Sequence, residues 1–398
     1  MNPRILIYFL LISFTFAGCV DPYQMETNTF EDAIVVEASV SNQNKQHTVK
    51  ITRAYRLEDS SPTIETGATV VVTDDAGNSY DFNFDSGVYK SVTAFQAVGG
   101  RAYTLTITTS DGSVYQSSSE SLTTSTEIES VEADVIIKDG QKGVQISVNS
   151  SDPSGNSKYY RYEYEETYKV VAPYWSENMA SVVLDSEAGM STGDVIVVEP
   201  RTYEARTCYS TNRSTDLIIT STTDLSSDMV QDFPVRFIAV TDPIIKHRYS
   251  VNVLQYVQSL AAYTFYKTLK ELSSTGDNIL AQNQPGFFYG NLQSVSDPSE
   301  KVIGFFEVSS VSQQRIFFNF EDLFPDDVPP PYLYECTTFE YNSTVFGPGD
   351  NQGATLRSQL LQGSAIYYSH VFPTYVLVRR ECGDCTTFSS NVVPDFWE

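Results

Sequence analysis

The sequence predicts a mainly β fold, with an N-terminal Ig-like or prealbumin-like β-sandwich. A larger, fibronectin III-like β-sandwich follows, with an inserted helix and a disulfide-bonded C-terminal segment. Short runs of alternating apolar and polar residues recur along the chain, and turn signals rich in Gly, Asp and Asn separate them. Tyr and Phe are abundant, with 26 and 23 copies, while charged residues make up only 19%. This composition is typical of a chain that builds large cores.

Residues 33–122 are predicted to form the first sandwich. Asp74–Gly77 is a turn signal of the kind that closes a hairpin. Tyr103, Leu105 and Ile107 alternate, so they share one face of a strand. Short strands with turns at this spacing favour a β-sandwich. The strand patterns lie at residues 34–40, 48–54, 67–73, 79–84, 87–89, 100–108 and 114–117.

Residues 123–325 are predicted to form the second, larger β-rich domain. A hairpin is expected around Asp139-Gly140, and the strand that follows it carries tyrosines on one face and charges on the other. We interpret it as a core strand whose charges face water, and not as a sugar-stacking platform. Its tyrosines are Tyr160, Tyr162, Tyr164 and Tyr168, and its charged residues are Arg161, Glu163, Glu165 and Lys169. Other strands are predicted at 131–137, 143–148, 194–198, 217–220, 235–240, 249–256, 302–308 and 315–319.

A helix is predicted near residues 257–272, because apolar residues recur there at helical spacing and Gly276 follows. The apolar stripe consists of Val257, Leu260, Ala261, Phe265, Leu269 and Leu272. We expect this helix to pack on the second sandwich. Residues 326–398 form a C-terminal, cysteine-containing segment that we expect to pack on the second domain, with a final strand at 371–378.

Four cysteines are predicted to form two structural disulfides: Cys208, Cys336, Cys382 and Cys385. An even number of cysteines suits an exported protein in an oxidising compartment. Three pairings are compatible with the sequence, with Cys336 bonded into the turn at residues 382–385 as a further expectation. The spacing of Cys382 and Cys385 also resembles a thiol redox motif, but no strand–helix context of the thioredoxin type surrounds it.

The N-terminus predicts export and lipid anchoring. Arg4 precedes an apolar stretch that is too short to span a bilayer, and Ala17-Gly18 lead directly into Cys19. We therefore predict a lipoprotein signal peptide at residues 1–18, acylation of Cys19 and a polar tether at 19–32. The expected location is the outer membrane, with the periplasmic and surface faces both left open. The alternative is ordinary secretory cleavage, with Cys19 as an incidental thiol.

The charge balance excludes one class of partner. The formal net charge is −25 and the sequence contains no basic stretch, so nucleic acid is not an expected partner. Attachment to a bilayer must then come from acyl chains.

Catalytic patterns are not found in the sequence, and we predict neither catalytic residues nor a cofactor. His47, His247 and His370 lie beside or within predicted strands, and neither G-x-S-x-G nor H-E-x-x-H occurs. Asp81, Asn83 and Asp85 resemble the alternate oxygen ligands of a calcium loop, although a strand with polar residues outward explains them more simply. No other metal ligands are predicted. The candidate ligand-binding aromatics are Tyr174, Trp175, Phe287, Phe288 and Tyr289.

Several segments, in their order along the chain, also resemble a known family. They include Val35–Ala38, Tyr160–Thr167, Arg248–Tyr256, Gln284–Gly286, Gly290–Leu292, Val302–Phe306, Cys382–Cys385 and Pro394–Trp397. The chain resembles the Bacteroidota lipoproteins of domain-of-unknown-function family 4249. The resemblance implies a lipid-anchored envelope protein, often encoded beside a TonB-dependent outer-membrane receptor, and it assigns no catalytic residues.

Three functions are compatible with these observations. The first hypothesis is a non-enzymatic accessory or binding component that acts with a TonB-dependent transporter. The second is a stand-alone surface lipoprotein that binds a glycan or a peptide. The third is a carboxylate-based hydrolase, for which Glu163 and Glu165 are roughly 7 Å apart along their strand.

Overall fold

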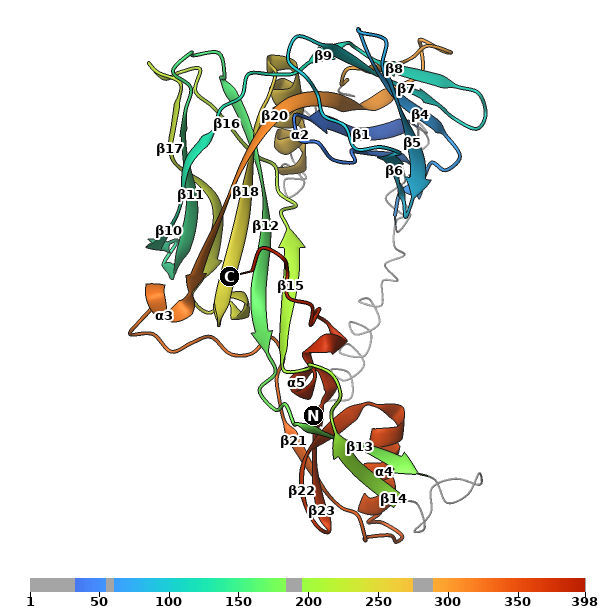
Figure 1. The fold of residues 1–398 in the computed structure, drawn as a ribbon, viewed down its shortest axis with the longest axis vertical. Coiled ribbons are helices and arrows are strands. Elements are labelled where there is room, and N and C mark those ends of the chain that lie inside the picture. The colour runs from blue at the N-terminus through green and yellow to red at the C-terminus, as the bar shows by residue number, and fades with distance from the viewer. Residues whose placement is uncertain (1–32, 55–60, 184–194, 275–288, 398) are drawn as a thin grey trace, which may run out of the picture.

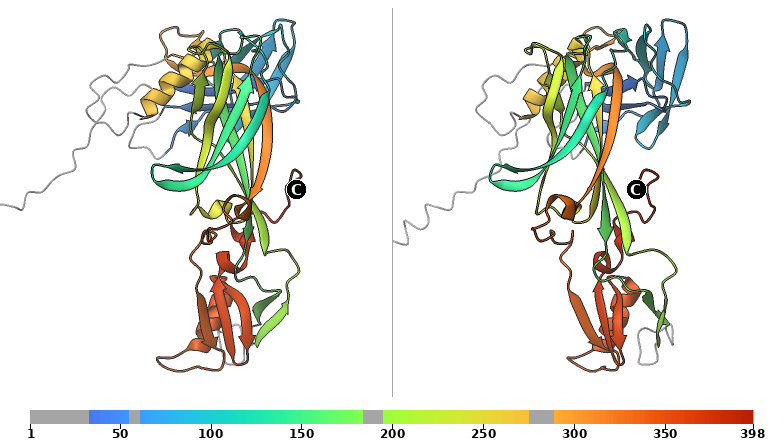
Figure 2. Two further views of the ribbon diagram at one scale, coloured as in Figure 1. Left: turned by 90° about the vertical axis from the view of Figure 1, so that its left-hand side faces the viewer. Right: turned by 60° about the vertical axis from the view of Figure 1, so that its left-hand side comes forward.

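The computed structural model describes residues 33–54, 61–183, 195–274 and 289–397, and the fold is mainly β, as predicted. The first sandwich lies beside the upper part of a second sandwich of long strands, and a small lobe lies at the other end of the long axis (Figure 1). In two further views the small lobe is again separated from the first sandwich (Figure 2). Within the described residues, none of the helices is long and apolar enough to cross a bilayer.

The first sandwich is built from a sheet in the order β1-β2-β6-β5-β4-β7-β8. The predicted hairpin at Asp74–Gly77 joins β4 to β5, and Tyr103, Leu105 and Ile107 of β7 are fully buried, as their alternation predicts. The strands are β1 (Ile34–Ser41), β2 (Thr48–Arg53), β3 (Thr63–Ile64), β4 (Thr69–Asp74), β5 (Ser79–Asp85), β6 (Val88–Ser91), β7 (Ala102–Thr108), β8 (Val114–Ser117) and β9 (Glu120–Ser121).

The second sandwich packs two sheets around one core. One sheet contains β10 (Ile128–Lys138), β11 (Gln141–Ser151) and β17 (Met229–Ala239). The other contains β15 (Thr207–Arg213), β12 (Tyr159–Val171), β18 (Arg248–Val257) and β20 (Val302–Asn319), with β16 (Ile218–Ser221) paired to β12. Short helices η2 (Pro243–Ile245) and α3 (Phe320–Leu323) precede β18 and follow β20. The four tyrosines of β12 face the core, as predicted.

The prediction that all the charges of β12 face water is wrong for Arg161. Helix α2 (Leu260–Ser274) covers this position, and Arg161 is only 7% exposed. Its guanidinium donates to Glu307 Oε2 at 3.0 Å and lies over the rings of Tyr256 and Tyr266, with centroid distances of 4.1 and 5.2 Å. The alternation of residue types along β12 shows which side chains share a face of the sheet. It does not show that a helix will cover the face that carries the charged residues.

Helix α2 begins later than the sequence pattern suggests. Val257 is the last residue of β18, and the Ser259 hydroxyl accepts a hydrogen bond from the Ala262 backbone N–H at 3.1 Å, in the manner of an N-cap. The buried face consequently runs through Ala262 and Phe265, whereas Leu260 is 60% exposed.

Strand β20 joins the two sandwiches. Its first half, Val302–Ser309, pairs in parallel with β1, and its second half, Ser310–Asn319, pairs antiparallel with β18. The sequence predicts two separate strands here because the intervening residues are polar. The serines among them are nevertheless buried: the hydroxyls of Ser310 and Ser312 donate to the carbonyls of Thr124 and Thr126 in the connection between the sandwiches.

The junction is closed by Asn291, which lies directly before β19 (Leu292–Ser294). Its side-chain amide donates to the Phe306 carbonyl at 2.9 Å and its carbonyl accepts from the Phe306 N–H at 2.8 Å, so it pairs with β20 as a strand residue would. Gly304 has φ +140°, and a Cβ there would lie 2.0 Å from the Val36 carbonyl oxygen. Gly290 is also restricted to glycine, because a Cβ there would lie 1.5 Å from the Gly304 carbonyl oxygen.

The small lobe combines the hairpin β13 (Asn178–Val183) and β14 (Val195–Pro200) with most of the C-terminal segment. The latter contributes β21 (Thr338–Asn342), α4 (Gln352–Gln362), β22 (Ala365–Val371), β23 (Thr374–Arg379), α5 (Arg380–Gly383) and η4 (Cys385–Thr387). The single strand predicted at 371–378 is wrong. It is the end of one strand and the start of the next, because Pro373 has no N–H with which to continue a ladder.

We expect Asn291→Ala to destabilise the protein by roughly 1–3 kcal/mol, because it leaves both polar groups of Phe306 without their partner. Chemical denaturation measures the change. Gln293→Ala is the matched control, since Gln293 is exposed on β19 and should leave stability unchanged. Equal effects of the two substitutions would contradict the role given to Asn291.

Candidate binding site

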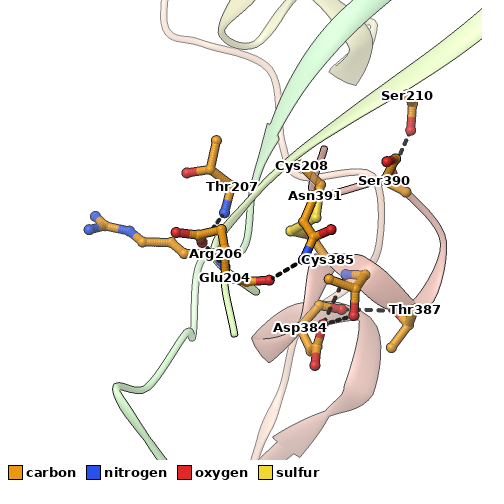
Figure 3. Close-up of a disulfide and its surroundings, with 12 residues drawn as sticks. Glu204, Arg206, Thr207, Cys208, Ser210, Asp384, Cys385, Thr387, Ser390 and Asn391 are labelled. Carbon is orange, nitrogen blue, oxygen red and sulfur yellow. Dashed lines mark hydrogen bonds between the residues drawn. A yellow bond between two sulfur atoms is a disulfide. The ribbon is translucent and has the colours of Figure 1, made fainter. Parts of the chain in front are cut away.

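One disulfide joins the second sandwich to the C-terminal segment, and the other closes a loop within that segment. Cys208 of β15 is bonded to Cys385, and Cys336 is bonded to Cys382 (Figure 3 shows the first). The two predicted disulfides are therefore present, and Cys336 is bonded into the turn at 382–385. Cys382 and Cys385 are bonded to different partners and not to each other, so both cysteines belong to structural disulfides and do not form a redox pair.

The turn between these cysteines is held by Asp384. Its Oδ2 accepts from Arg201 at 3.0 Å and from the Tyr203 hydroxyl at 2.7 Å, while its Oδ1 accepts from the Thr386 backbone N–H at 2.9 Å. Burial and the hydrogen bond to Asp384 raise the pKa of Tyr203. Gly383 admits no side chain, because a Cβ would lie 2.8 Å from Ile366 Cδ1.

A cleft of about 870 Å³ lies beside this junction. Its first wall is β15, through Tyr209, Ser210, Thr211 and Asn212; its second is the segment 386–390 after the last cysteine. Leu333 and Tyr334 form the third side, with Tyr168 also in the lining. Each wall adjoins a disulfide, since Cys208 precedes Tyr209, Cys385 precedes the segment 386–390, and Cys336 follows Tyr334 by two residues.

Hydroxyl groups and aromatic rings dominate the lining. Tyr334 is 40% exposed, and its ring meets that of Phe388 edge to face with 4.8 Å between the centroids. The hydroxyls of Ser210 and Ser389 bond to each other where residues 389–390 pair with β15. On the other face of β15, the Thr211 hydroxyl bonds to that of Thr167 at 2.9 Å. A hydroxyl has one donor and two acceptor positions, so each keeps capacity for a ligand.

The C-terminal residues pack beside the cleft. Tyr209 and Ser390 exchange backbone hydrogen bonds of 2.8 and 3.2 Å, which adds the tail to the edge of β15. Further on, the ring of Trp397 contacts those of Tyr209 and Phe317 edge to face. Asn391 donates to the Glu204 carbonyl at 2.8 Å (Figure 3). The tail therefore helps to fix the position of the second wall.

A family model described as "Domain of unknown function (DUF4249)" matches residues 20–315 of the chain. The protein belongs to the DUF4249 family. The match covers both sandwiches up to residue 315, within β20, so the β15 wall of the cleft lies inside it and the other two walls lie beyond it. A search of curated proteins finds no match.

The aromatic residues predicted to bind a ligand are not part of this cleft. Tyr174 donates its backbone N–H to the Cys382 carbonyl and packs against Tyr368, while Trp175 is half-buried against the second core with Arg206 over its ring. Tyr289 is 67% exposed and borders a separate hollow of about 530 Å³ next to α2. Phe287 and Phe288, like Cys19, lie outside the described residues.

The calcium candidates of this DUF4249 protein lie on β5 as alternate residues. Asp81, Asn83 and Asp85 are all exposed, and Asp85 forms an ion pair with Lys90 at 2.9 Å. In the described parts of the chain, no group of three or more His, Cys, Asp and Glu residues is arranged to hold a metal ion.

His47, His370 and the two carboxylates considered for hydrolysis have structural partners. His47 Nε2 lies 2.9 Å from the Phe95 carbonyl oxygen, and burial lowers the pKa of this imidazole to about 4. His370 bonds to the Tyr367 hydroxyl. Glu163 pairs with Arg161, and Glu165 pairs with Arg213 and Arg315.

The cleft is not evident from the sequence because its walls lie far apart along the chain. A local signal is nevertheless present. Uncharged aromatic and hydroxyl residues follow Cys208 and Cys385, in the runs Tyr209–Asn212 and Thr386–Ser390. In a chain with 50 acidic residues, two such runs next to cysteines could have marked a shared surface.

We expect the double substitution Cys208→Ser with Cys385→Ser to loosen the cleft selectively. Removing a native disulfide costs roughly 2–5 kcal/mol, and the loss should appear where the bond holds two walls together. Hydrogen exchange should accelerate in β15 and in residues 386–390, while β4 and β7 of the first sandwich serve as the internal control. Unchanged protection in both cleft walls would refute a bracing role for this disulfide.

Proposed function

We propose that this DUF4249 protein is a lipid-anchored component of the cell envelope that binds and does not catalyse. It acts as an accessory to a TonB-dependent outer-membrane transporter, and it offers the disulfide-braced cleft as its binding surface. The observation that carries the binding role is the cleft itself. Both disulfides brace its walls, and twelve uncharged residues line it.

Support for export comes from two independent features. Disulfides form and persist in oxidising compartments, and here two of them join segments distant in the sequence. The N-terminal pattern that ends at Cys19 is typical of a lipoprotein signal, and residues 1–19 lie outside the family match. Both features suit a protein that folds beyond the cytoplasm.

Support for binding comes from the chemistry of the lining. Acid–base catalysis requires a group that gains or loses a proton near neutral pH, within reach of the substrate. The twelve lining residues are Tyr, Ser, Thr, Asn, Leu and Phe, which favour contact and hydrogen bonding. The second candidate function, a stand-alone surface binder, would use the same cleft without a transporter.

Lipid anchoring predicts that Cys19→Ser abolishes incorporation of an alkyne-labelled fatty acid. The wild-type protein should carry the label and sediment with outer membranes, because two or more acyl chains hold a protein stably on a bilayer. Intact-mass spectrometry checks the mature N-terminus. A wild-type protein with a free Cys19 thiol, released into the medium, would overturn the anchor.

The accessory role predicts recovery of a transporter. A full-length protein tagged after a linker at its C-terminus, extracted from membranes in mild detergent, should co-purify with a TonB-dependent receptor identified by mass spectrometry. An unrelated lipoprotein with the same tag is the control. If repeated preparations recover no such receptor while the protein remains anchored, the stand-alone binder is the better description.

A further inference from the structure

We infer that the cleft binds a neutral, hydroxyl-rich ligand, namely an uncharged glycan. This inference rests on the proposed binding function and adds the chemical class of the ligand. It draws on the charge of the lining, on the arrangement of its rings and hydroxyls, and on the hydrogen bonds already made along its edge.

The lining of the cleft lacks charged residues although the chain as a whole has many. The chain has 25 basic and 50 acidic residues, yet none of the twelve described residues that line the cleft is charged. Asp384, which lies just before the second wall, is buried and accepts hydrogen bonds from Arg201 and Tyr203. A charged ligand would meet no opposite charge within the lining and would lose its hydration, which is costly.

The rings and hydroxyls suit the two faces of a sugar. Tyr334 and Phe388 stand edge to face, so their faces point in different directions along one side. The face of an aromatic ring is electron-rich and attracts the C–H groups of a pyranose ring. Ser210 and Asn212 of β15, which share the face of the sheet that carries Tyr168, present donors and acceptors for sugar hydroxyls.

Asp384 fixes the hydroxyls of the second wall. Thr386 donates its hydroxyl to Asp384 Oδ1 at 2.5 Å, and Thr387 donates its hydroxyl to the Asp384 carbonyl at 2.9 Å. Each hydroxyl keeps acceptor capacity for a ligand, and acceptors that are orientated before binding lose less freedom when the ligand arrives. Asp384 is therefore a positioning residue, which acts on the ligand through these threonines.

An extended peptide suits the cleft less well. Peptides commonly bind by adding a strand to an open sheet edge, and β15 is the edge that borders the cleft. At Tyr209 both backbone hydrogen-bonding groups are already paired with Ser390. A peptide strand would have to displace the tail, whereas a glycan needs only the side chains.

The test uses the full-length lipidated protein in nanodiscs and an array of neutral and acidic glycans and uncharged extended peptides, with calorimetry on those retained. We expect a neutral glycan to bind and Tyr334→Ala to weaken it roughly tenfold or more. Tyr334→Phe, which keeps the ring, should bind nearly as wild type. Tyr289→Ala is the matched control, because Tyr289 is an exposed aromatic at a different hollow.

Several outcomes would overturn the inference. These are binding of no neutral glycan, preference for an acidic glycan or an uncharged extended peptide, or weakening by Tyr289→Ala and not by Tyr334→Ala. Thermal unfolding of each variant shows that a loss of binding is not a loss of folding. Anchoring and receptor recovery are measured in separate experiments. A wrong ligand class would therefore leave the proposed function intact, and a failure of the glycan test can be distinguished from a failure of the proposed function.

Discussion

Strand β20 belongs to two sheets, and this sharing determines how the rest of the molecule is arranged. Val302–Ser309 extends the first sandwich beside β1, and the chain then continues without a break as the neighbour of β18. A continuous strand leaves little freedom for a hinge, because rotation between the sandwiches would break ladder hydrogen bonds on one side. Arg161 and Glu307 lie buried at this junction under α2, where removing one charge would leave the other without compensation. The two sandwiches are therefore one rigid support for the elements at the far end.

The small lobe depends on a different kind of constraint. Its core cluster has five buried hydrophobic residues, among them Leu356 and Leu377, far fewer than the cores of the two sandwiches. Small cores supply little stabilisation, and small exported units commonly compensate with disulfides. Here both disulfides converge on Cys382 and Cys385, next to the cleft. The walls of the cleft are thus positioned by covalent bonds and by Asp384, together with the packing of Tyr168, Leu333 and Phe388 on the core of the second sandwich.

The sequence predicts those features that depend on local alternation. The strands around Tyr103 and Tyr160 follow from period-two patterns, and the fold class follows from their number and spacing. The continuity of β20 could not be predicted, since Ser309–Gln314 lacks an apolar pattern and two of its serines find their hydrogen-bond partners, such as the Thr126 carbonyl, far away in the sequence. The burial of Arg161 depends on α2, and the cleft depends on three separated segments. Features that form from distant segments leave little trace in the sequence. For the cleft, the trace is the uncharged composition of the residues that follow Cys208 and Cys385.

The boundary of the family match falls between the two sandwiches and two of the three walls of the cleft. Residues 20–315 contain both sandwiches, the parallel half of β20 and the β15 wall, whereas Tyr334, Phe388 and Asp384 all lie beyond them. A protein divided in this way can keep one rigid support while its last segment changes which ligand it accepts. The Cys208–Cys385 disulfide links the C-terminal segment covalently to the matched part of the chain at the edge of the cleft. Exchange of residues on the second and third walls would alter the ligand without disturbing the hydrogen-bonded junction at Asn291 and Gly304.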